Sequence, residues 1–285
     1  MKRYKIGVII VTYFPNLKEL TLNINNLLSD GVSIFIYKNC NTELPFEKQS
    51  NIIIKGNGEN IGLSKAQNIG LQYFLKTKVD FVSTFDQDST ITKNYLQDAM
   101  ENLVQLNSVN SKIRVIVPYL VDKDSTKLIS KEKVIKKVDG FTEILREGTC
   151  SGMFMFSSII EDYGDFRENF FIDYIDFEWS WRIRLYGEKI ARSKRLTIYH
   201  SLGEGDINIL GKTISVCNSD RIYYQIRNLK YLKSYKYTPK KWIVKQKIRL
   251  ILRIIIYTIY SKNLDFIKQA LRGLRAYRSL SFTPN

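Results

Sequence analysis

Residues 79–89 have the sequence VDFVSTFDQDS, an apolar and β-branched run that ends in two acidic residues. The run over 79–85 predicts a buried strand, and Asp86-Gln87-Asp88 follows it directly. In open α/β sheets, ligands bind at the carboxyl ends of the strands, which is where these carboxylates fall. Two carboxylates one residue apart can hold a divalent ion that bridges to a diphosphate. Because the same spacing also occurs in solvated turns, its position after a strand is what favours a binding site.

The sequence around this strand alternates between short apolar runs and segments with helical spacing. Such alternation predicts an α/β fold in which a mostly parallel sheet is covered by helices. We expect further strands at 6–11, 32–37, 51–55, 114–118 and 133–138, and short strands at 190–191 and 196–200. We expect helices at 17–28, 63–75, 92–106 and 176–186, the first capped by Asn16 and the third by Thr92.

The segment from Asn60 to Gly70, NIGLSKAQNIG, is a glycine loop that enters the second of these helices. It does not have the GxGxxG spacing of a dinucleotide-binding loop. Two interpretations stay open: an Asn-capped helix whose glycines allow close packing on the sheet, or a loop that binds a ligand.

Charge is distributed very unevenly along the chain. The 285 residues carry a formal net charge of +16, with 44% hydrophobic residues, a composition that excludes disordered and collagen-like proteins. Residues 221–285 contain 16 Lys or Arg and a single acidic residue, Asp265, so +15 of the net charge lies there. A neutral body with a basic end is typical of an enzyme with an electrostatic docking segment. We therefore expect a catalytic domain over 1–220 and a basic extension over 221–285, with helices at 220–234, 240–260 and 264–279.

Cysteine usage and hydropathy favour a reducing compartment and no membrane crossing. Cys40, Cys150 and Cys217 are odd in number, far apart and without a CxxC pair, which argues against disulfides or a thiolate metal site. The apolar run near the N-terminus is too short for a secretion signal. Arg249 and Arg253 interrupt the most apolar C-terminal segment, so we expect no membrane-spanning helix.

Further motifs occur in a fixed order along residues 5–230. They are Val11-Thr12-Tyr13, Asn39, the 60–70 segment, Asp86-Gln87-Asp88-Ser89, FIDYIDFEW at 171–179, HSLGE at 200–204 and RIYYQIRN at 221–228. Together these motifs resemble the family-2 inverting glycosyltransferases of the GT-A fold, most closely the bacterial rhamnosyltransferase-like branch. The sequence departs from that pattern at Lys38, where many relatives have an acidic residue before Asn39.

The resemblance implies a site for a nucleotide-sugar donor and a divalent cation, Mg²⁺ or Mn²⁺. The residues it places around the donor are Thr12, Tyr13, Asn39, Asn60, Gly62, Asn68, Asp86 and Arg227. It makes Asp88 the main metal ligand, with Asp86 and His200 beside it. The chemistry agrees, because breaking a sugar–diphosphate bond develops negative charge that a cation stabilises in the transition state. The alternative for His200 is a structural role, and that for Arg227 is a solvated helix face.

The resemblance also implies a carboxylate base that takes the proton of the attacking acceptor hydroxyl. Asp176 fits the family position best and Asp173 is the alternative, while both could merely complement a helix dipole. The acceptor would lie near Trp179, Ser151 and Gly152. For Trp179 a place in the core is the competing interpretation.

The function that the resemblance implies is transfer of L-rhamnose from dTDP-L-rhamnose to a glycan or lipid-linked acceptor in bacterial surface polysaccharide synthesis, such as O-antigen or capsule. A transferase that uses UDP-linked glucose, galactose or N-acetylhexosamine is the alternative. Two other classes are a non-catalytic basic module that binds an acidic polymer and a nucleotidyltransferase. We expect no nucleic acid as partner, because the excess of positive charge is confined to one end of the chain.

The basic segment also carries Trp242 and many Ile and Leu residues between 240 and 256. A helix of this composition suits an anionic membrane surface, and the alternative is a homodimer interface. We therefore expect a cytoplasmic enzyme held peripherally at the inner face of the cell membrane.

Overall fold

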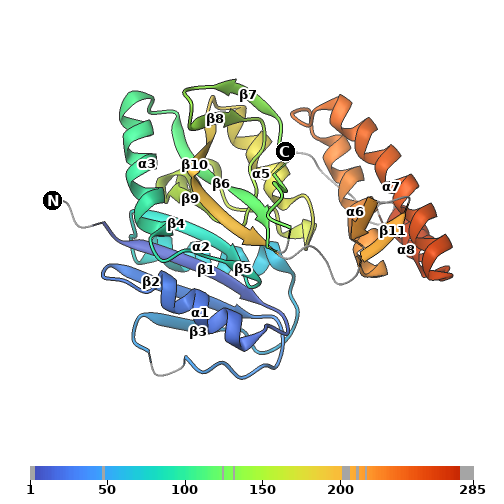
Figure 1. Cartoon of the computed structure of the whole chain (residues 1–285), viewed down its shortest axis with the longest axis horizontal. Coiled ribbons are helices and arrows are strands. Elements are labelled where there is room, and N and C mark those ends of the chain that lie inside the picture. Colours follow the sequence, from blue (N-terminus) through green and yellow to red (C-terminus); the bar gives the residue numbers. More distant parts are fainter. Residues whose placement is uncertain are drawn as a thin grey trace. The chain divides into compact units, whose positions relative to one another are not determined.

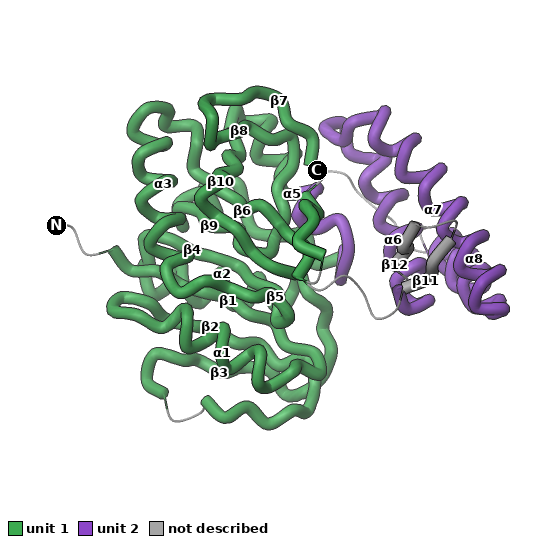
Figure 2. Tube along the Cα trace, in the orientation of Figure 1, with its two compact units in different colours: residues 1–169, 179–201 green, residues 170–178, 202–285 purple. Residues whose placement is uncertain are grey.

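The structure is a computed structural model that describes residues 4–46, 49–123, 125–130, 132–200, 206–209, 212–215 and 217–276. The chain divides into two compact units (Figures 1 and 2). Unit 1 comprises residues 1–169 and 179–201, and unit 2 comprises residues 170–178 and 202–285. The sequence-based division at residue 220 is a different partition and stays a prediction.

Unit 1 is built on one mixed sheet with the strand order β3-β2-β1-β4-β9-β6-β10-β8-β7, to which β5 adds by pairing with β10. The strands are β1 (Ile6–Thr12), β2 (Val32–Lys38), β3 (Ile52–Lys55), β4 (Phe81–Asp86), β5 (Ser89–Thr90), β6 (Ile113–Asp122), β7 (Val134–Lys137), β8 (Thr142–Leu145), β9 (Met153–Phe156) and β10 (Lys189–His200). β3, β2, β1 and β4 are parallel, as are β6 and β10, whereas β9 runs antiparallel between β4 and β6. The predicted α/β class, a mostly parallel sheet flanked by helices, is confirmed.

Helices cover this sheet because its central strands are apolar on both faces. They are α1 (Leu17–Leu27), α2 (Leu63–Lys76), α3 (Tyr95–Val109), the short α4 (Ser158–Tyr163), the 3₁₀ turn η1 (Glu168–Phe170) and α5 (Ile175–Arg184), whose first four residues belong to unit 2. α2 packs on β1 and β2, and α3 packs on β6 and β10. At Gly7 a Cβ atom would lie 2.5 Å from the Phe74 ring, so glycine is what allows α2 to approach β1.

The two predicted helix caps have opposite outcomes. Asn16 caps α1 as expected, since its side chain accepts hydrogen bonds from the backbone N–H groups of Lys18 and Glu19. Thr92 does not cap α3, which begins at Tyr95 after Asn94. The reason is tertiary: the backbone N–H of Ile91 donates to Asn23 of α1, so the chain is held to α1 before the helix can start.

The two short strands predicted at 190–191 and 196–200 are one strand, β10. Its pairing with β6 shifts register between Arg192 and Thr197, and this irregularity explains why the polar residues there read as a break. β8 pairs with the first part of β10, and β5 pairs with its end.

Unit 2 contains the hairpin of β11 (Asp206–Ile209) and β12 (Lys212–Ser215), followed by α6 (Ser219–Ser234), α7 (Lys240–Ser261) and α8 (Asp265–Ala276). α6 contacts both α7 and α8 around a small core of Ile222, Tyr257, Phe266 and Ala270. The three predicted helices are confirmed, apart from residues 277–279 of the third, which lie outside the described residues. Among the residues that the structure describes, no helix is long and apolar enough to cross a membrane.

Candidate active site

The turn Asp86-Gln87-Asp88, called the DxD turn below, lies at the carboxyl end of β4. Asp86 is the last residue of that strand. The chain then forms β5, which pairs antiparallel with the end of β10 and places Ser89 opposite His200. This pairing brings the only histidine of the chain beside two carboxylates that precede it by more than a hundred residues.

Asp86, Asp88 and His200 form a group whose ligand atoms all lie within 4.8 Å of one another, the one such group found among the described residues. Nε2 of His200 lies 3.3 Å from Oδ2 of Asp86, and Nδ1 lies 3.9 Å from Oδ1 of Asp88. The Asp88 side chain is 54% exposed and that of His200 17%, so the group opens to solvent through the carboxylates. Two carboxylates and an imidazole fit a divalent cation of the Mn²⁺ type, and the carboxylates alone also suit Mg²⁺.

Two of the three members of this group, Asp88 and His200, have a raised pKa. Burial raises the pKa of Asp88, the charge of Asp86 adds to this, and His200 opposes it. Burial lowers the pKa of His200, but its hydrogen bond to Asp86 and the charges of both carboxylates outweigh burial and raise it overall. In the metal-free group, protons and a cation therefore compete for the same side-chain atoms.

Neighbouring side chains fix the turn and the strand that follows it. Asn23 of α1 donates to the carbonyl of Ser89 and accepts from the N–H of Ile91 at 3.1 Å, and all of this is buried. The Ser89 and Ser151 hydroxyls are 2.7 Å apart, and Ser151 also accepts from the N–H of Asp86. Asn23 has no motif signal, so reasoning from the sequence could not find it.

Gln87, between the two carboxylates, joins the DxD turn to the end of β1. Its Oε1 accepts from the N–H of Tyr13 at 2.6 Å, and its Nε2 donates to the carbonyl of Tyr13 at 2.9 Å. The Tyr13 ring is exposed, whereas Thr12 is buried and its hydroxyl donates to the carbonyl of Tyr37. Thr12 and Tyr13 thus lie at the same end of the sheet as Asp86, Asp88 and His200, which are called the metal-ligand group below.

Asn39 follows β2 at that edge and organises the glycine loop before α2. Its Oδ1 accepts from the N–H of Ile61, and its Nδ2 donates to the carbonyl of Gly62 at 3.4 Å. Asn60 accepts from the N–H of Gly62, which has a φ of +87° at the N-terminus of α2. The exposed Asn60 and the buried Asn39 therefore shape one loop, and their contact with a nucleoside stays a prediction.

The structure contradicts two of the proposed contact residues. Trp179 has no exposed surface, and its indole N–H donates to the carbonyl of Gly164, so it cannot stack on a sugar ring. Asn68 is buried and exchanges two hydrogen bonds with the backbone of Phe166, so its amide holds that segment against α2 instead of lining a donor pocket. Both corrections arise because tertiary packing covers these helix faces.

Ser151 and Gly152 lie directly before β9, buried beside β4. Gly152 has a φ of +72°, and a Cβ atom there would lie 2.3 Å from Ile198. Tyr95 donates from its hydroxyl to the carbonyl of Gly152. These contacts give the pair a structural role below the DxD turn, and contact with an acceptor stays a prediction.

The two candidate bases lie close together in sequence in unit 2: Asp173 just before α5, and Asp176 in the first turn of α5. Arg221 donates to both oxygens of Asp173, at 2.7 and 3.3 Å, and Gln225 donates to one of them at 3.5 Å. Asp176 lies in the first turn of α5, where its Oδ1 accepts from the N–H of Phe177 at 2.9 Å. Asp173 thus forms a bidentate ion pair with Arg221, and Asp176 lies at the N-terminus of α5.

The backbone of this segment is strained and is held by the RIYYQIRN motif. Phe171, Asp173 and Tyr174 all have a φ above +60°, an uncommon conformation for residues with a Cβ atom. Asn228 donates from Nδ2 to the carbonyls of Phe170, Ile172 and Asp173.

Arg227 donates to the carbonyl of Phe170 and stacks over the Tyr224 ring at 4.9 Å. Within unit 2 it therefore has a positioning role, and phosphate binding by Arg227 stays a prediction. Residues 201–204 of the HSLGE motif lie outside the described residues.

No family model matches this chain. A curated relative, the dTDP-rhamnosyl transferase RfbF of Shigella flexneri, is 26% identical over an alignment of 288 positions that covers 95% of this chain and 95% of the relative. Among solved structures, S. aureus TarS matches with a TM-score of 0.59 and 14% identity, over 96% of this chain and 48% of TarS. TarS 1–349 in complex with UDP-GlcNAc matches with a TM-score of 0.59 and 15% identity, over 96% of this chain and 80% of that one. GalNAc-T7 with UDP, GalNAc and Mn²⁺ matches with a TM-score of 0.54 and 14% identity, over 90% and 57%.

These comparisons confirm the predicted resemblance and identify the fold as GT-A. This chain spans about half the length of the full TarS and GalNAc-T7 chains, so those matches speak for the fold alone. The rhamnosyl transferase match extends over nearly all of both chains and supports glycosyl transfer as the activity.

Proposed function

We propose that this chain is an inverting, metal-assisted glycosyltransferase that moves L-rhamnose from dTDP-L-rhamnose to a hydroxyl of a glycan or lipid-linked acceptor. The observation that carries the proposal is the Asp86–Asp88–His200 group at the carboxyl end of β4 in a GT-A sheet. The choice of rhamnose rests on the similarity to the dTDP-rhamnosyl transferase. UDP-linked sugars are the alternative donors, because two structural neighbours were solved with UDP or UDP-GlcNAc.

In this proposal the metal-ligand group serves the leaving nucleotide. A divalent cation held by Asp88, Asp86 and His200 would supply positive charge to the diphosphate as its bond to the sugar breaks. The chain's own contribution is to hold the ligands in place: Asn23 and Ser151 fix the turn, and Gln87 ties it to β1. Asn39 and the loop at Asn60 would meet the nucleoside at the same edge of the sheet.

We assign the base to Asp176 in preference to Asp173, because Asp176 fits the position of the base in the resembled family best. As the acceptor oxygen bonds to the anomeric carbon and the carbon–diphosphate bond breaks, the hydroxyl proton must pass to a carboxylate oxygen. Both oxygens of Asp173 already accept from Arg221, which leaves them poorly placed for a substrate proton. The Asp173–Arg221 pair would instead position the segment before α5.

The proposed setting is the cytoplasmic face of a membrane, in the synthesis of a surface polysaccharide such as O-antigen or capsule. The basic helices of unit 2 support this setting, because anionic lipid headgroups attract clustered Lys and Arg. A homodimer through the same helices is the alternative.

The proposal is tested with a panel of dTDP-L-rhamnose, UDP-glucose, UDP-galactose and UDP-GlcNAc, each with Mg²⁺, with Mn²⁺ and with EDTA. We expect dTDP-L-rhamnose with a divalent cation to give the fastest donor hydrolysis and the largest thermal stabilisation. NMR of the product of the first accepted acceptor should show inversion at the anomeric carbon. Hydrolysis that is indifferent to EDTA for every donor contradicts the metal-assisted mechanism, and preference for a UDP-sugar contradicts rhamnose.

A further inference from the structure

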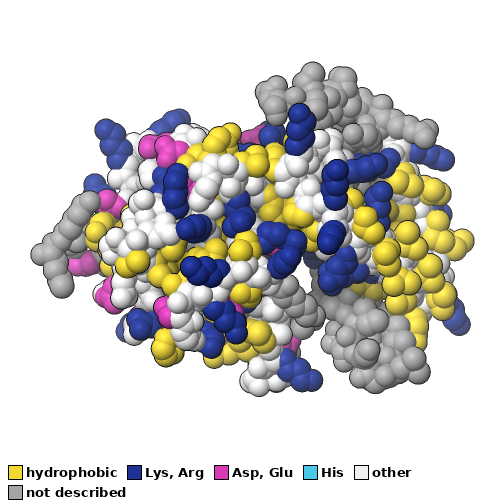
Figure 3. All heavy atoms as spheres, turned by 90° about the horizontal axis from the view of Figure 1, so that it is seen from above, with side chains coloured by type: hydrophobic (Ala, Val, Ile, Leu, Met, Phe, Trp, Pro, Cys, Tyr) yellow, Lys and Arg dark blue, Asp and Glu magenta, His cyan; other side chains and the backbone are white. Residues whose placement is uncertain are grey.

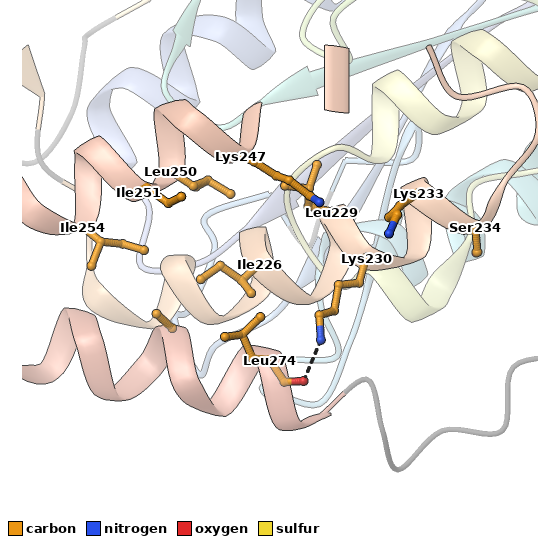
Figure 4. Close-up of a pocket in the computed structure, with 11 residues that line it drawn as sticks. Ile226, Leu229, Lys230, Lys233, Ser234, Lys247, Leu250, Ile251, Ile254 and Leu274 are labelled. Carbon is orange, nitrogen blue, oxygen red and sulfur yellow. Dashed lines mark hydrogen bonds between the residues drawn. The ribbon is translucent and has the colours of Figure 1, made fainter. Parts of the chain in front are cut away.

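A groove of about 580 Å³ runs along the helices of unit 2 (Figure 4). Its wall is made of aliphatic side chains from all three helices: Ile226, Leu229, Leu250, Ile251, Ile254, Ala270 and Leu274. The volume is in the range of small-molecule sites, and the lining is almost wholly apolar. A groove of this kind accepts a hydrocarbon chain better than a sugar or a nucleotide.

Three lysines, Lys230, Lys233 and Lys247, border the groove, and none of the described residues that line it is acidic. Lys230 donates to the carbonyl of Leu274 at 2.9 Å, which is the dashed line in Figure 4. Lys233 and Lys247 are exposed, and in the part of the chain that the structure describes neither of them forms an ion pair. Cations at the margin of an apolar groove complement a ligand with one hydrocarbon chain and an anionic head.

The groove opens on a surface that is itself apolar. Large hydrophobic side chains of α7 and α8 are exposed next to it, and Figure 3 shows hydrophobic residues gathered over the helices of unit 2. They include Ile248, Ile251, Leu252, Ile255, Ile267, Leu271 and Leu274. Exposed apolar side chains that cluster in this way mark an interaction site, and lysines among them suit the interface between a bilayer and water.

We propose that this groove is a binding site for one anionic membrane lipid, with an acyl chain along the apolar wall and the phosphate at Lys233 and Lys247. Charge favours this occupant over a second copy of the chain, because residues 221–285 carry +15 and two such surfaces repel each other. The proposal does not depend on the transferase activity, since binding can be measured without any sugar nucleotide.

The test is calorimetric titration of the full chain with dioctanoyl phosphatidylglycerol, a short-chain anionic lipid, below its critical micelle concentration. Dioctanoyl phosphatidylcholine and inorganic phosphate are titrated in parallel. We expect saturable binding of one phosphatidylglycerol per chain, weaker binding of phosphatidylcholine and no competition by phosphate alone. Phosphate that competes fully would show an anion site without a chain, and would overturn the proposal.

One variant blocks the groove, and it has a matched control. Ala270→Trp fills the groove from α8, and we expect the affinity for phosphatidylglycerol to fall at least about tenfold, since each buried CH₂ contributes a factor of about four. Leu271→Trp adds the same side chain one residue further along α8, outside the lining, and should bind like the wild type. Should Ala270→Trp not fold by circular dichroism, the exposed pair Ile251→Ser and Leu274→Ser takes its place and should show the same loss.

The head-group contact is tested separately. Lys233→Gln with Lys247→Gln should reduce the preference for phosphatidylglycerol over phosphatidylcholine by at least about fivefold, because each lysine near an anionic head contributes about 1 kcal/mol. Lys236→Gln with Lys262→Gln removes the same charge from exposed positions outside the lining and should keep the preference. Unchanged binding in the groove variants overturns the proposal, as does a dimer in sedimentation that only Ala270→Trp dissociates.

Discussion

At the scale of single residues, the candidate site depends on three side chains that share one small volume. Asp86 and Asp88 come from one turn, and His200 comes from the end of β10. Their mutual distances put protons and a cation in competition for the same oxygen and nitrogen atoms. Changes of charge at these positions should therefore affect the metal before they affect the fold.

The first prediction concerns the main metal ligand. Asp88→Asn removes a charge from a half-exposed side chain, so we expect the fold to persist and turnover to fall at least about 100-fold. Steady-state kinetics with Mn²⁺ and circular dichroism measure the two effects. Asp98→Asn on α3, outside the group of Asp86, Asp88 and His200, is the matched control and should keep full activity. An Asp88→Asn enzyme as active as this control would remove the metal from the mechanism.

The second prediction concerns pH. The pKa of His200 is raised above its usual 6.5, because Asp86 and Asp88 outweigh burial. In the metal-free protein the proton on His200 therefore stabilises the fold fully below about pH 6.5, and this contribution is lost as pH rises through the raised pKa. Mn²⁺ needs the neutral imidazole, so its affinity should rise with pH over the same window, up to about tenfold per unit.

Calorimetry in buffers of different ionisation enthalpy counts the protons that Mn²⁺ displaces. At pH 6, below the raised pKa of His200, we expect up to one more proton to be released by the wild type than by His200→Gln. Equal proton release in the two proteins would place His200 outside the metal site.

The third prediction separates the two candidate bases. Asp176→Asn should bind the donor with near-normal affinity and lose about 10²–10⁴-fold in kcat, because a base acts only in the transition state. Asp173→Asn breaks the pair with Arg221, so we expect lower thermal stability and a smaller kinetic effect. A larger loss of kcat in Asp173→Asn, at unchanged stability, would reverse the assignment.

At the scale of secondary structure elements, the pairing of β5 with β10 is what assembles the site. This short ladder holds Ser89 opposite His200, and Asn23 of α1 fastens the chain on both sides of Thr90. Helix α1 thus supports the metal-ligand group without contributing a ligand to it.

The fourth prediction tests this support. Asn23→Ala leaves the buried carbonyl of Ser89 and the N–H of Ile91 without their partner, which should cost about 1–3 kcal/mol in the free energy of unfolding. Mn²⁺ affinity should fall about 10–100-fold, as for other residues that orient metal ligands. Urea unfolding and Mn²⁺ titration measure both effects. Asn102→Ala removes a similar amide from α3 and should leave Mn²⁺ affinity unchanged; an equal loss there would mean that the effect is general destabilisation.

At the scale of the whole molecule, the charge divides the chain into a nearly neutral part, residues 1–220, and a strongly basic part, residues 221–285. Residues 1–220 contain 28 of the 44 Lys and Arg against 27 of the 28 acidic residues. The remaining basic residues fall on α6, α7 and α8 and on the residues around them, together with exposed aliphatic side chains. This distribution predicts attachment to anionic surfaces by both charge and apolar insertion.

The fifth prediction measures that attachment. The full chain should co-sediment with vesicles that contain phosphatidylglycerol at low salt, and high salt should weaken but not abolish binding. Replacing Lys240, Lys241, Lys245 and Lys247 by Gln should release the protein, since each contributes about 1 kcal/mol at an anionic surface. The same change at four exposed lysines of unit 1, Lys55, Lys76, Lys93 and Lys127, should have no effect. Release by both sets would indicate a response to net charge alone, without a docking surface.

Most elements of the fold could be predicted from local patterns in the sequence. The strands of the parallel half and the helices α1, α2 and α6 to α8 follow from apolar periodicity and caps such as Asn16, because these signals depend on neighbours in the sequence. The DxD turn was visible for the same reason, since its carboxylates follow the apolar run of β4 directly. The resemblance of the ordered motifs then identified the GT-A fold.

Tertiary structure decided what depends on distant segments. Helix α3 begins at Tyr95 and not at the predicted Thr92, and the chain just before it is held by the hydrogen bond from Ile91 to Asn23. The predicted break in β10 is absent because pairing with β6 accommodates the irregularity. The burial of Trp179 could not be read from helical spacing, which does not say which neighbour covers a face. The sequence by itself determined which residues could bind a cation and where strands end. Only the tertiary structure decided that His200 lies beside Asp86, because the register of β5 on β10 sets the distance between these two residues.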